Sequence, residues 1–318
     1  MSNCSLNITA GIQNFQLAVL IPTFIFGVPA NVYVLIMFCR RARSAWTDIN
    51  IYISNMAVAD CVMLVLLPIR IMSIYENTLV SRYWDQTNKE LCYVLVSVYY
   101  VNMYVSIFNI TAISIVRFIA IKYPMKAREI FSRRKALVVC ALIWLVTCSL
   151  SVAFHRVDDP KHNSTIKCFQ KNKKEELPLT FILVLNVVGF ISPFLIMSFC
   201  SIRVIFTLRK QLDIGSRAEK MQCIFIMLAN LCVFVVCFFP VHFGFLLKYI
   251  TQAHKYSCDA QILAHNFVHG AICVSSMNCA LDCVTYYFAT RTSWTIRCCR
   301  QKLHEEYKCH YSSTRSSQ

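Results

Sequence analysis

The chain has 318 residues, of which 57% are hydrophobic and only 15% charged, and its formal net charge is +16. A soluble domain normally carries about a quarter charged residues, so this composition argues against a soluble globular protein and favours a membrane protein. A nucleic-acid-binding protein could be as basic but would not be as apolar, and we therefore expect no nucleic-acid partner.

Apolar runs of about 20 residues are typical of membrane-spanning helices. Seven such runs are separated by short polar links, without an internal repeat of the kind found in many transporters. No cleavable signal peptide is expected, because the first run is long enough to span. The predicted spans are Gln16–Cys39, Asn50–Met72, Cys92–Ile121, Ala136–Phe154, Leu177–Leu208, Gln222–Tyr249 and Ala260–Phe288.

The distribution of lysine and arginine predicts the orientation of these spans. One set of loops carries 21 of the 32 basic residues and the other set carries 11. Cytoplasmic loops are enriched in these residues, so the N-terminus is predicted to be extracellular. Glycosylation sequons at Asn3, Asn7 and Asn163 all fall on the predicted outer side. We expect a plasma-membrane protein with an extracellular tail (1–15), a seven-helix transmembrane domain (16–288) and a cytoplasmic tail (289–318).

Polar residues and prolines interrupt the apolar runs. Polar groups inside a membrane are costly, so they indicate functional positions. In chain order they are Asn31, Asn55, Asp60, Asn102, Ser106, Asn109, Arg117, Trp144, Pro193, Pro240, His242, Asn278, Asp282 and Tyr286.

With these motifs in this order, the chain resembles the rhodopsin-like (class A) G-protein-coupled receptors over nearly its whole length. The matching segments are NMAVAD (55–60), VRF (116–118), CFFP (237–240) and DCVTY (282–286), together with Asn31 and Pro124. The resemblance implies heterotrimeric G proteins and arrestin as partners. It also implies a disulfide bond between Cys92 and Cys168.

Two departures from the common pattern narrow the subgroup. Cys283 replaces the usual proline within MNCALDCVTYYF, and phenylalanine replaces the usual tryptophan within LANLCVFVVCFFPVHFGF. These stretches, with FCRRARSAWTDINIYISNMAVAD, resemble the G-protein coupled receptor 35-like and 55-like subgroup. The resemblance implies the sensing of small carboxylates or lysophospholipids outside the cell.

Cationic residues near the predicted outer mouth favour an anionic ligand. Arg70 follows Pro68 near the outer end of the second span, where snorkelling towards the interface is the alternative explanation. The other candidate ligand-binding residues are Tyr99, Tyr100, Met103, Arg156, His242, Lys248, His265 and His269. The aromatic and methionine side chains suit an apolar ligand body, although ordinary helix packing would explain them as well.

Five polar residues are expected to meet in the middle of the bundle, where the resemblance implies an allosteric sodium ion: Asp60, Asn102, Ser106, Asn278 and Asp282. Two carboxylates in a low dielectric repel each other unless a cation lies between them or one is protonated. The alternative is an interhelical hydrogen-bond network. No other cofactor is expected.

At the predicted inner end, the resemblance makes Arg117 the residue that inserts towards the G protein. The preceding residue is usually an acid that holds this arginine in the resting state, but here it is Val116. Losing such a partner should weaken the resting state by about 1–2 kcal/mol, which predicts raised basal signalling unless Glu219 substitutes. The resemblance also assigns activation roles to Phe118, Phe238, Pro240 and Tyr286.

Cysteines outside the spans indicate further modifications. Cys4 and Cys258 lie on the predicted outer side, where a second disulfide bond between them is expected. Cys298 and Cys299 follow a short amphipathic stretch, Thr290–Arg297, predicted to form a cytoplasmic helix. Juxtamembrane cysteines of this kind favour S-palmitoylation, with free thiols as the alternative.

These observations predict a cell-surface G-protein-coupled receptor embedded among membrane lipids. Known catalytic motifs, such as HExxH, GxSxG or a Walker loop, are absent from the sequence, and we expect no enzyme activity. The alternative is an ion-coupled transporter or channel that uses the central carboxylates.

Overall fold

The computed structural model describes residues 6, 8–40, 46–74, 89–157, 179–210 and 217–283. The side chains of residues 89–93, 128, 154–157 and 219 lie outside this description. The helices are α1 (Ala10–Cys39), α2 (Asp48–Ile74), α4 (Lys89–Lys122), α5 (Pro124–Ile130), α6 (Arg133–Val157), α7 (Leu179–Asn186), η2 (Val187–Ile191), α8 (Ser192–Lys210), α9 (Arg217–Ala253) and α10 (Cys258–Ser276).

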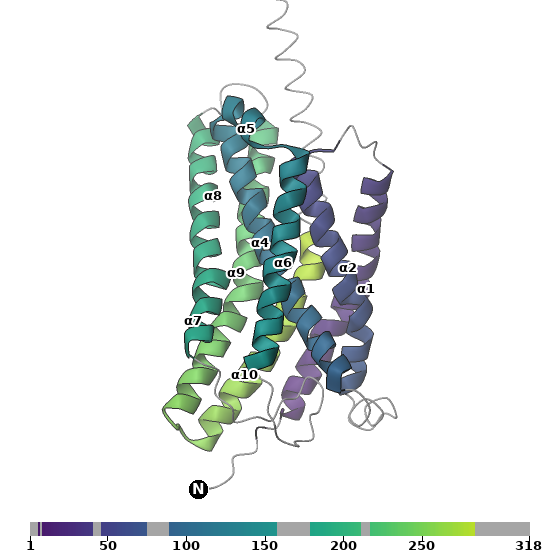
Figure 1. The fold of residues 1–318 in the computed structure, drawn as a ribbon, viewed down its shortest axis with the longest axis vertical. Helices are drawn as coiled ribbons and strands as arrows, with labels where there is room; N and C mark the ends of the chain where they lie inside the picture. The colour runs from purple at the N-terminus through teal and green to yellow at the C-terminus, as the bar shows by residue number, and fades with distance from the viewer. Residues whose placement is uncertain are drawn as a thin grey trace, which may run out of the picture.

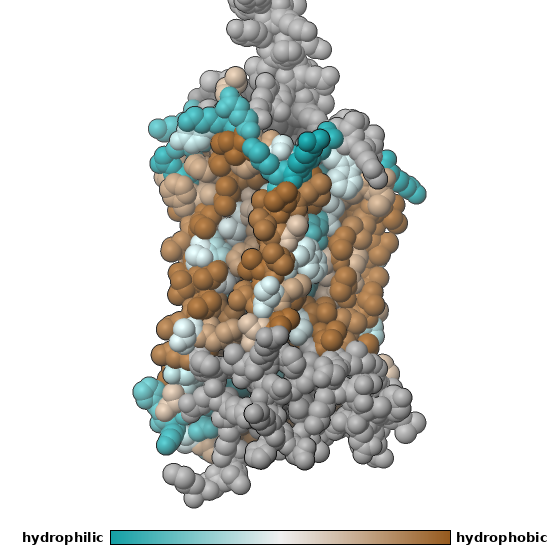
Figure 2. Space-filling model, in the orientation of Figure 1, coloured by the Kyte–Doolittle hydropathy of each residue, from teal (hydrophilic) through white to brown (hydrophobic). Residues whose placement is uncertain are grey.

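The long helices run side by side in one elongated bundle, with the start of α1 at one end and α5 at the other (Figure 1). We refer to the end where α1 and α10 begin as the first end, and to the end that carries α5 as the second end. A hydrophobic band surrounds the visible middle of the bundle, and hydrophilic residues gather at the second end (Figure 2). This arrangement is that of a protein surrounded by lipid.

In the described part of the chain, six helical segments are long and apolar enough to cross a membrane. They agree with the first six predicted spans, and α7, η2 and α8 together form the fifth (Leu179–Lys210). The predicted seventh span (Ala260–Phe288) is not among these six. Its first part lies in α10, which packs against α1 and α9. After a turn at Met277, residues 278–283 are helical again.

The bundle is organised around α4, which contacts α2, α5, α6, α8 and α9. A hydrogen-bond chain fixes three helices at one level. The Trp144 Nε1 donates to Asn55 Oδ1 over 2.9 Å, and Asn55 Nδ2 donates to Asn109 Oδ1 over 3.1 Å. Buried polar groups must be paired. These hydrogen bonds therefore give Asn55, Asn109 and Trp144 a structural role.

The π-helical segment η2 allows a close approach that an ordinary side chain would prevent. A Cβ atom at Gly189 would lie 2.5 Å from Tyr104 Cε1 and 3.3 Å from His242 Nε2. Without that atom, the ring of Tyr104 packs directly on the backbone of η2. The π-helical turn of η2 and Gly189 therefore determine how closely α4 and α9 pack against the fifth span.

Candidate functional site

At the first end, the side chain of Arg70 lies inside the bundle rather than at the membrane interface. It is 6% exposed. Its Nη2 donates to Cys273 Sγ over 3.3 Å, and its Cζ lies 4.4 Å from the centroid of the Tyr99 ring. A snorkelling arginine would point its guanidinium to water, so this placement does not fit the snorkelling alternative.

His269 lies near Arg70, and two further basic side chains, His265 and Lys248, lie near His269. His265 and His269 stand one turn apart on α10, with ring centroids 4.5 Å apart. The charge of Lys248 on α9 acts on both rings, and the charge of Arg70 also acts on His269. Neither ring nitrogen of the buried His265 has a hydrogen-bond partner among the described residues. Several donors therefore converge on one region between α2, α9 and α10, as an anion-binding site requires.

The aromatic residues of α4 hold this region together. The hydroxyl of Tyr99 contacts the carbonyl of Ile272 and the hydroxyls of Ser275 and Ser276. Its ring meets that of Tyr100 edge-on, with centroids 6.0 Å apart. Tyr99 is thus a structural bridge between α4 and α10 as well as the aromatic face beneath Arg70.

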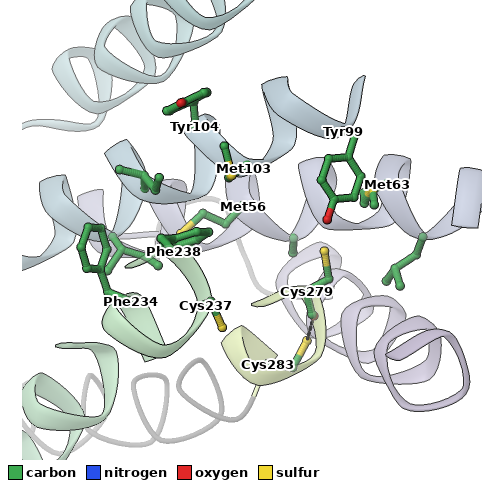
Figure 3. Packing of buried hydrophobic residues seen from close by; sticks show 14 of the residues in the cluster. Met56, Met63, Tyr99, Met103, Tyr104, Phe234, Cys237, Phe238, Cys279 and Cys283 are labelled. Atoms are coloured by element: carbon green, nitrogen blue, oxygen red, sulfur yellow. Dashed lines mark hydrogen bonds between the residues drawn. The ribbon is translucent and has the colours of Figure 1, made fainter. Parts of the chain in front are cut away.

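His242 lies deeper than a residue at the mouth of the bundle. Its Nδ1 pairs with the carbonyl of Phe238 at 2.8 Å, and its Nε2 lies 3.4 Å from the hydroxyl of Tyr104. The ring stacks on Phe190 with centroids 5.2 Å apart. His242 therefore belongs to a buried aromatic cluster next to η2, which also includes Phe234 and Phe238 (Figure 3). Met103 is buried in the same core.

In the middle of the bundle, acidic and polar residues surround Cys279. Asn102 Nδ2 donates to Cys279 Sγ over 3.4 Å, and the charges of Asp60 and Asp282 both act on this cysteine. Cys283 also lies near both acids, and its Sγ donates to the carbonyl of Cys279 over 3.6 Å. Figure 3 shows Cys279 and Cys283 on successive turns in the core. The structure therefore brings Asp60, Asn102 and Asp282 together.

Several oxygen atoms in this central cluster lack protein partners. Cys279 and Asn102 lie next to the carboxylate of Asp60, and the side-chain oxygens of Asn102, Ser106 and Asn278 have no hydrogen-bond partner among the described residues. Burying an oxygen atom without a hydrogen-bond partner costs free energy. Oxygen atoms are also the ligands that a hard cation prefers. No group of three His, Cys, Asp or Glu side chains suited to a metal occurs in the described part of the chain.

Near the second end, Arg117 is buried, and no acidic side chain among the described residues lies next to it. Its side chain is 8% exposed, and Nη1 has no hydrogen-bond partner among the described residues. The thiol of Cys223 on α9 lies near it. Val116 is buried in the apolar core. Glu219, the predicted substitute partner, has its side chain outside the described residues.

Phe118 forms an aromatic contact between α4 and the fifth span. Its ring meets Phe199 edge-on with centroids 5.7 Å apart, and meets Tyr123 with centroids 6.3 Å apart. Pro240 lies inside α9, two residues after the buried Phe238. These placements are compatible with the activation roles that the sequence predicts for them.

Several predicted site residues fall outside the description. For Cys92 and Arg156 only the backbone is described. The residues that lie wholly outside the described ranges are Cys4, Cys168, Tyr286, Asn3, Asn7, Asn163, Cys298 and Cys299. Cys258 is disulfide-bonded, and the other cysteines whose side chains the structure describes are free. Its predicted pairing with Cys4 stays a prediction.

Sequence reasoning missed three residues of the first-end region and its surroundings: Cys273, Tyr104 and Gly189. Cys273 lies eight residues after His265 and four after His269, so their shared helix face was a usable signal. Tyr104 and Gly189 gave no such signal, because their contact depends on the π-helical turn of η2.

A family model described as "7 transmembrane receptor (rhodopsin family)" matches residues 30–286. The chain therefore belongs to this family of receptors, whose members are not in general enzymes. Together with the apolar helices, this makes it a multi-pass plasma-membrane protein and a G-protein-coupled receptor. The match gives no support to the transporter or channel alternative.

Individual relatives confirm the predicted subgroup. G-protein coupled receptor 55 of Mus musculus is 31% identical over 309 residues, which cover 91% of this chain and 90% of the relative. G-protein coupled receptor 35 of Mus musculus is 29% identical over 291 residues, covering 91% and 89%. Lysophosphatidic acid receptor 4 of Homo sapiens is 30% identical over 281 residues, covering 86% and 74%.

Proposed function

We propose that this receptor binds an anionic lipid or a small carboxylate at the first end of the bundle and then activates heterotrimeric G proteins. The observation that carries the proposal is the burial of Arg70 between Tyr99 and Cys273, close to His269. Arginine forms paired hydrogen bonds with carboxylate and phosphate groups. A ligand carboxylate or phosphate that enters this region would be held by charge-assisted hydrogen bonds.

The surroundings of Arg70 support a ligand with both an anionic and an apolar part. Lys248, His265 and His269 add donors on the α9 and α10 side. Tyr100 packs against Phe245 with ring centroids 6.2 Å apart, which adds apolar surface nearby. The name of one relative, lysophosphatidic acid receptor 4, refers to an anionic lysophospholipid. Arg156 remains a further candidate contact.

In this proposal the first end faces the outside of the cell and the second end faces the cytoplasm. The counts of basic residues on the two sets of loops support this orientation. The seventh span would consist of α10 and the helical residues 278–283, followed by a cytoplasmic amphipathic helix. Ligand binding would favour a state in which α9 moves outward around Pro240 and opens a cleft next to Arg117. A ligand can do so only by binding that state more tightly. Arrestin would be a second cytoplasmic partner.

We also propose that the central cluster holds an allosteric sodium ion. The oxygens of Asp60, Asn102, Ser106, Asn278 and Asp282 would hold it, and its charge would offset that of the two buried carboxylates. The lack of protein partners for both oxygens of Asp60 supports this assignment over a closed hydrogen-bond network.

The modifications predicted from the sequence complete the proposal. They are disulfide bonds Cys92–Cys168 and Cys4–Cys258, N-glycosylation at Asn3, Asn7 and Asn163, and palmitoylation at Cys298 and Cys299. All except the last are placed on the extracellular side by the proposed orientation.

The ligand proposal is tested by a G-protein activation assay with a panel of lysophospholipids and small carboxylates, on cells that express equal surface amounts of each variant. Hydrogen bonds to a charged group contribute about 1.5–3 kcal/mol. The Arg70→Ala variant should therefore raise the EC50 of an active anion by about 10- to 100-fold.

Two further variants control this experiment. Arg70→Lys retains the charge and should recover part of the affinity. Lys255→Asn removes an exposed charge at the same end, where the backbone has a φ of 50° that asparagine tolerates, and it should leave the EC50 unchanged. An Arg70→Ala response equal to wild type for every active anion would contradict the site. Activation by neutral or cationic compounds only would contradict the ligand class.

A further inference from the structure

The thiol of Cys273 on α10 has polar neighbours on two other helices. The side chain is 0% exposed, and its Sγ accepts a hydrogen bond from Arg70 Nη2 over 3.3 Å. The side-chain amide of Gln16 on α1 also hydrogen-bonds this thiol. A buried free cysteine usually acts as a small apolar side chain. Cys273 instead accepts hydrogen bonds from α1 and α2.

The arginine beside Cys273 favours the reactive form of the sulfur. The thiolate, rather than the thiol, is the nucleophile, and an adjacent arginine stabilises the negative charge of a thiolate. The charge of Arg70 acts directly on Cys273. Cys148 on α6 and Cys232 on α9 are also free, but they are exposed. These two cysteines therefore provide reference thiols.

The same arginine can hold a carboxylate next to the sulfur. A guanidinium has five N–H donors, so Arg70 can donate to a carboxylate while Nη2 remains beside Cys273. Charge-assisted hydrogen bonds of this kind are about 2.7–2.9 Å long. A carboxylate on Arg70 would therefore bring the carbon atom bonded to it within reach of the sulfur.

Two histidines of α10 precede Cys273 on the same helix face. His269 lies near Arg70 and is one turn before Cys273, and residues four apart are neighbours on a helix surface. His265 is 1% exposed, and neither of its ring nitrogens has a hydrogen-bond partner among the described residues. Buried polar atoms are normally paired, so His265 indicates a place for a polar group of a ligand.

We propose that Cys273 is a covalent attachment site for small unsaturated carboxylates whose double bond is also conjugated to a second carbonyl group. The inference rests on the proposed function, because Arg70 would hold the carboxylate. It also rests on the proposed orientation, which opens this end of the bundle to ligands from outside the cell.

The reaction is an addition of S–H across the double bond. The sulfur forms a bond to the carbon next to the carboxylate, and the π electrons move towards the second carbonyl group, whose oxygen gains the negative charge. His269 would donate a hydrogen bond to this oxygen. The other carbon of the double bond then takes up a proton in place of the one that the thiol lost. No oxidant or reductant is needed.

The reaction is tested by mass-spectrometric peptide mapping of the purified full-length receptor in detergent. The probe is monomethyl fumarate. Dimethyl fumarate lacks the free carboxylate, and monomethyl succinate lacks the double bond. Each rate of adduct formation is divided by the rate of the same compound with free glutathione, which removes the difference in intrinsic reactivity.

At Cys273 the normalised rate of monomethyl fumarate should be at least tenfold higher than that of dimethyl fumarate. Cys148 and Cys232 should show no such preference for the free carboxylate. Monomethyl succinate should form no adduct. Either the same ratio of rates at all three cysteines or the lack of an adduct at Cys273 would overturn the inference.

Variants separate the role of the arginine from that of general access. Arg70→Gln should abolish the preference for monomethyl fumarate at Cys273. Lys255→Asn at the same end should keep the preference within twofold of wild type. The comparison of compounds on the wild-type receptor decides the outcome if the Arg70 variant does not fold.

The result is separate from that of the EC50 experiment. A raised EC50 of saturated anions in Arg70→Ala, without labelling of Cys273, would refute the covalent step alone. Labelling of Cys273 with the expected preference, but with no anion that activates the receptor, would refute the proposed receptor function alone.

Discussion

Replacing Val116 by aspartate should restore the missing acidic neighbour of Arg117 and lower the signalling of the receptor without ligand. Arg117 is 8% exposed, and its Nη1 lacks a hydrogen-bond partner among the described residues. A charge-assisted hydrogen bond to such a group contributes about 1.5–3 kcal/mol. Part of this is offset by the cost of burying a carboxylate where Val116 now packs at 3% exposure.

The net effect should be about 1–2 kcal/mol in favour of the resting state, which corresponds to roughly a tenfold fall in the active population. The assay is ligand-free GTPγS binding to membranes, normalised to the amount of receptor at the cell surface. Any polar residue at this buried position disturbs packing. The matched control is therefore Val116→Asn, because asparagine has the shape of aspartate without its charge.

The comparison between the two variants decides the outcome. Basal GTPγS binding should be several-fold lower for Val116→Asp than for Val116→Asn at equal surface expression. If the aspartate variant signals as strongly as the asparagine variant, or more strongly, then a missing acid does not raise basal activity. Some other contact, such as one from Glu219, would then hold Arg117.

Two further predictions concern the core of the bundle. Replacing sodium by choline at constant ionic strength should lower the melting temperature of the purified wild-type receptor, because a bound ion stabilises the folded state. The same exchange should leave Asp60→Asn unaffected, and equal shifts in both proteins would exclude Asp60 as a ligand of the ion. Gly189→Ala should destabilise the receptor by about 1–3 kcal/mol, since its Cβ would meet Tyr104 Cε1 at 2.5 Å. Gly11→Ala, with open space around its Cβ, is the control for thermal unfolding, and similar melting temperatures for both variants would contradict the close packing.

Much of the fold could be predicted from local patterns. Hydropathy over about 20 residues identifies spanning helices because each helix satisfies its own backbone in lipid. The first six predicted spans are confirmed in this way. The seventh run agrees with α10 in position, but its buried polar residues weaken the hydropathy signal: His265, Asn266, Ser275 and Ser276. The motifs also identified the family, because their order along the chain needs no knowledge of contacts.

The candidate site could be predicted only as a set of residues near one mouth. The sequence placed Arg70, His265 and His269 at similar depth, because depth follows from the position within a span. It could not tell whether the arginine points to the interface or into the bundle. That choice depends on the rotation of α2 relative to α4 and α10, which brings Tyr99 beneath the guanidinium and Cys273 beside it.

The amino-acid sequence by itself therefore determined the membrane class, the number and order of the apolar runs, and the residues that carry charge within them. Only the tertiary structure decided which of those residues meet. The hydrogen bond from Arg70 to Cys273 joins residues of α2 and α10 that are 203 positions apart in the chain. The contact of Tyr104 with Gly189 needs a π-helical turn. Such contacts depend on the rotation and irregularity of packed helices, and neither property is encoded in the hydropathy of a single segment.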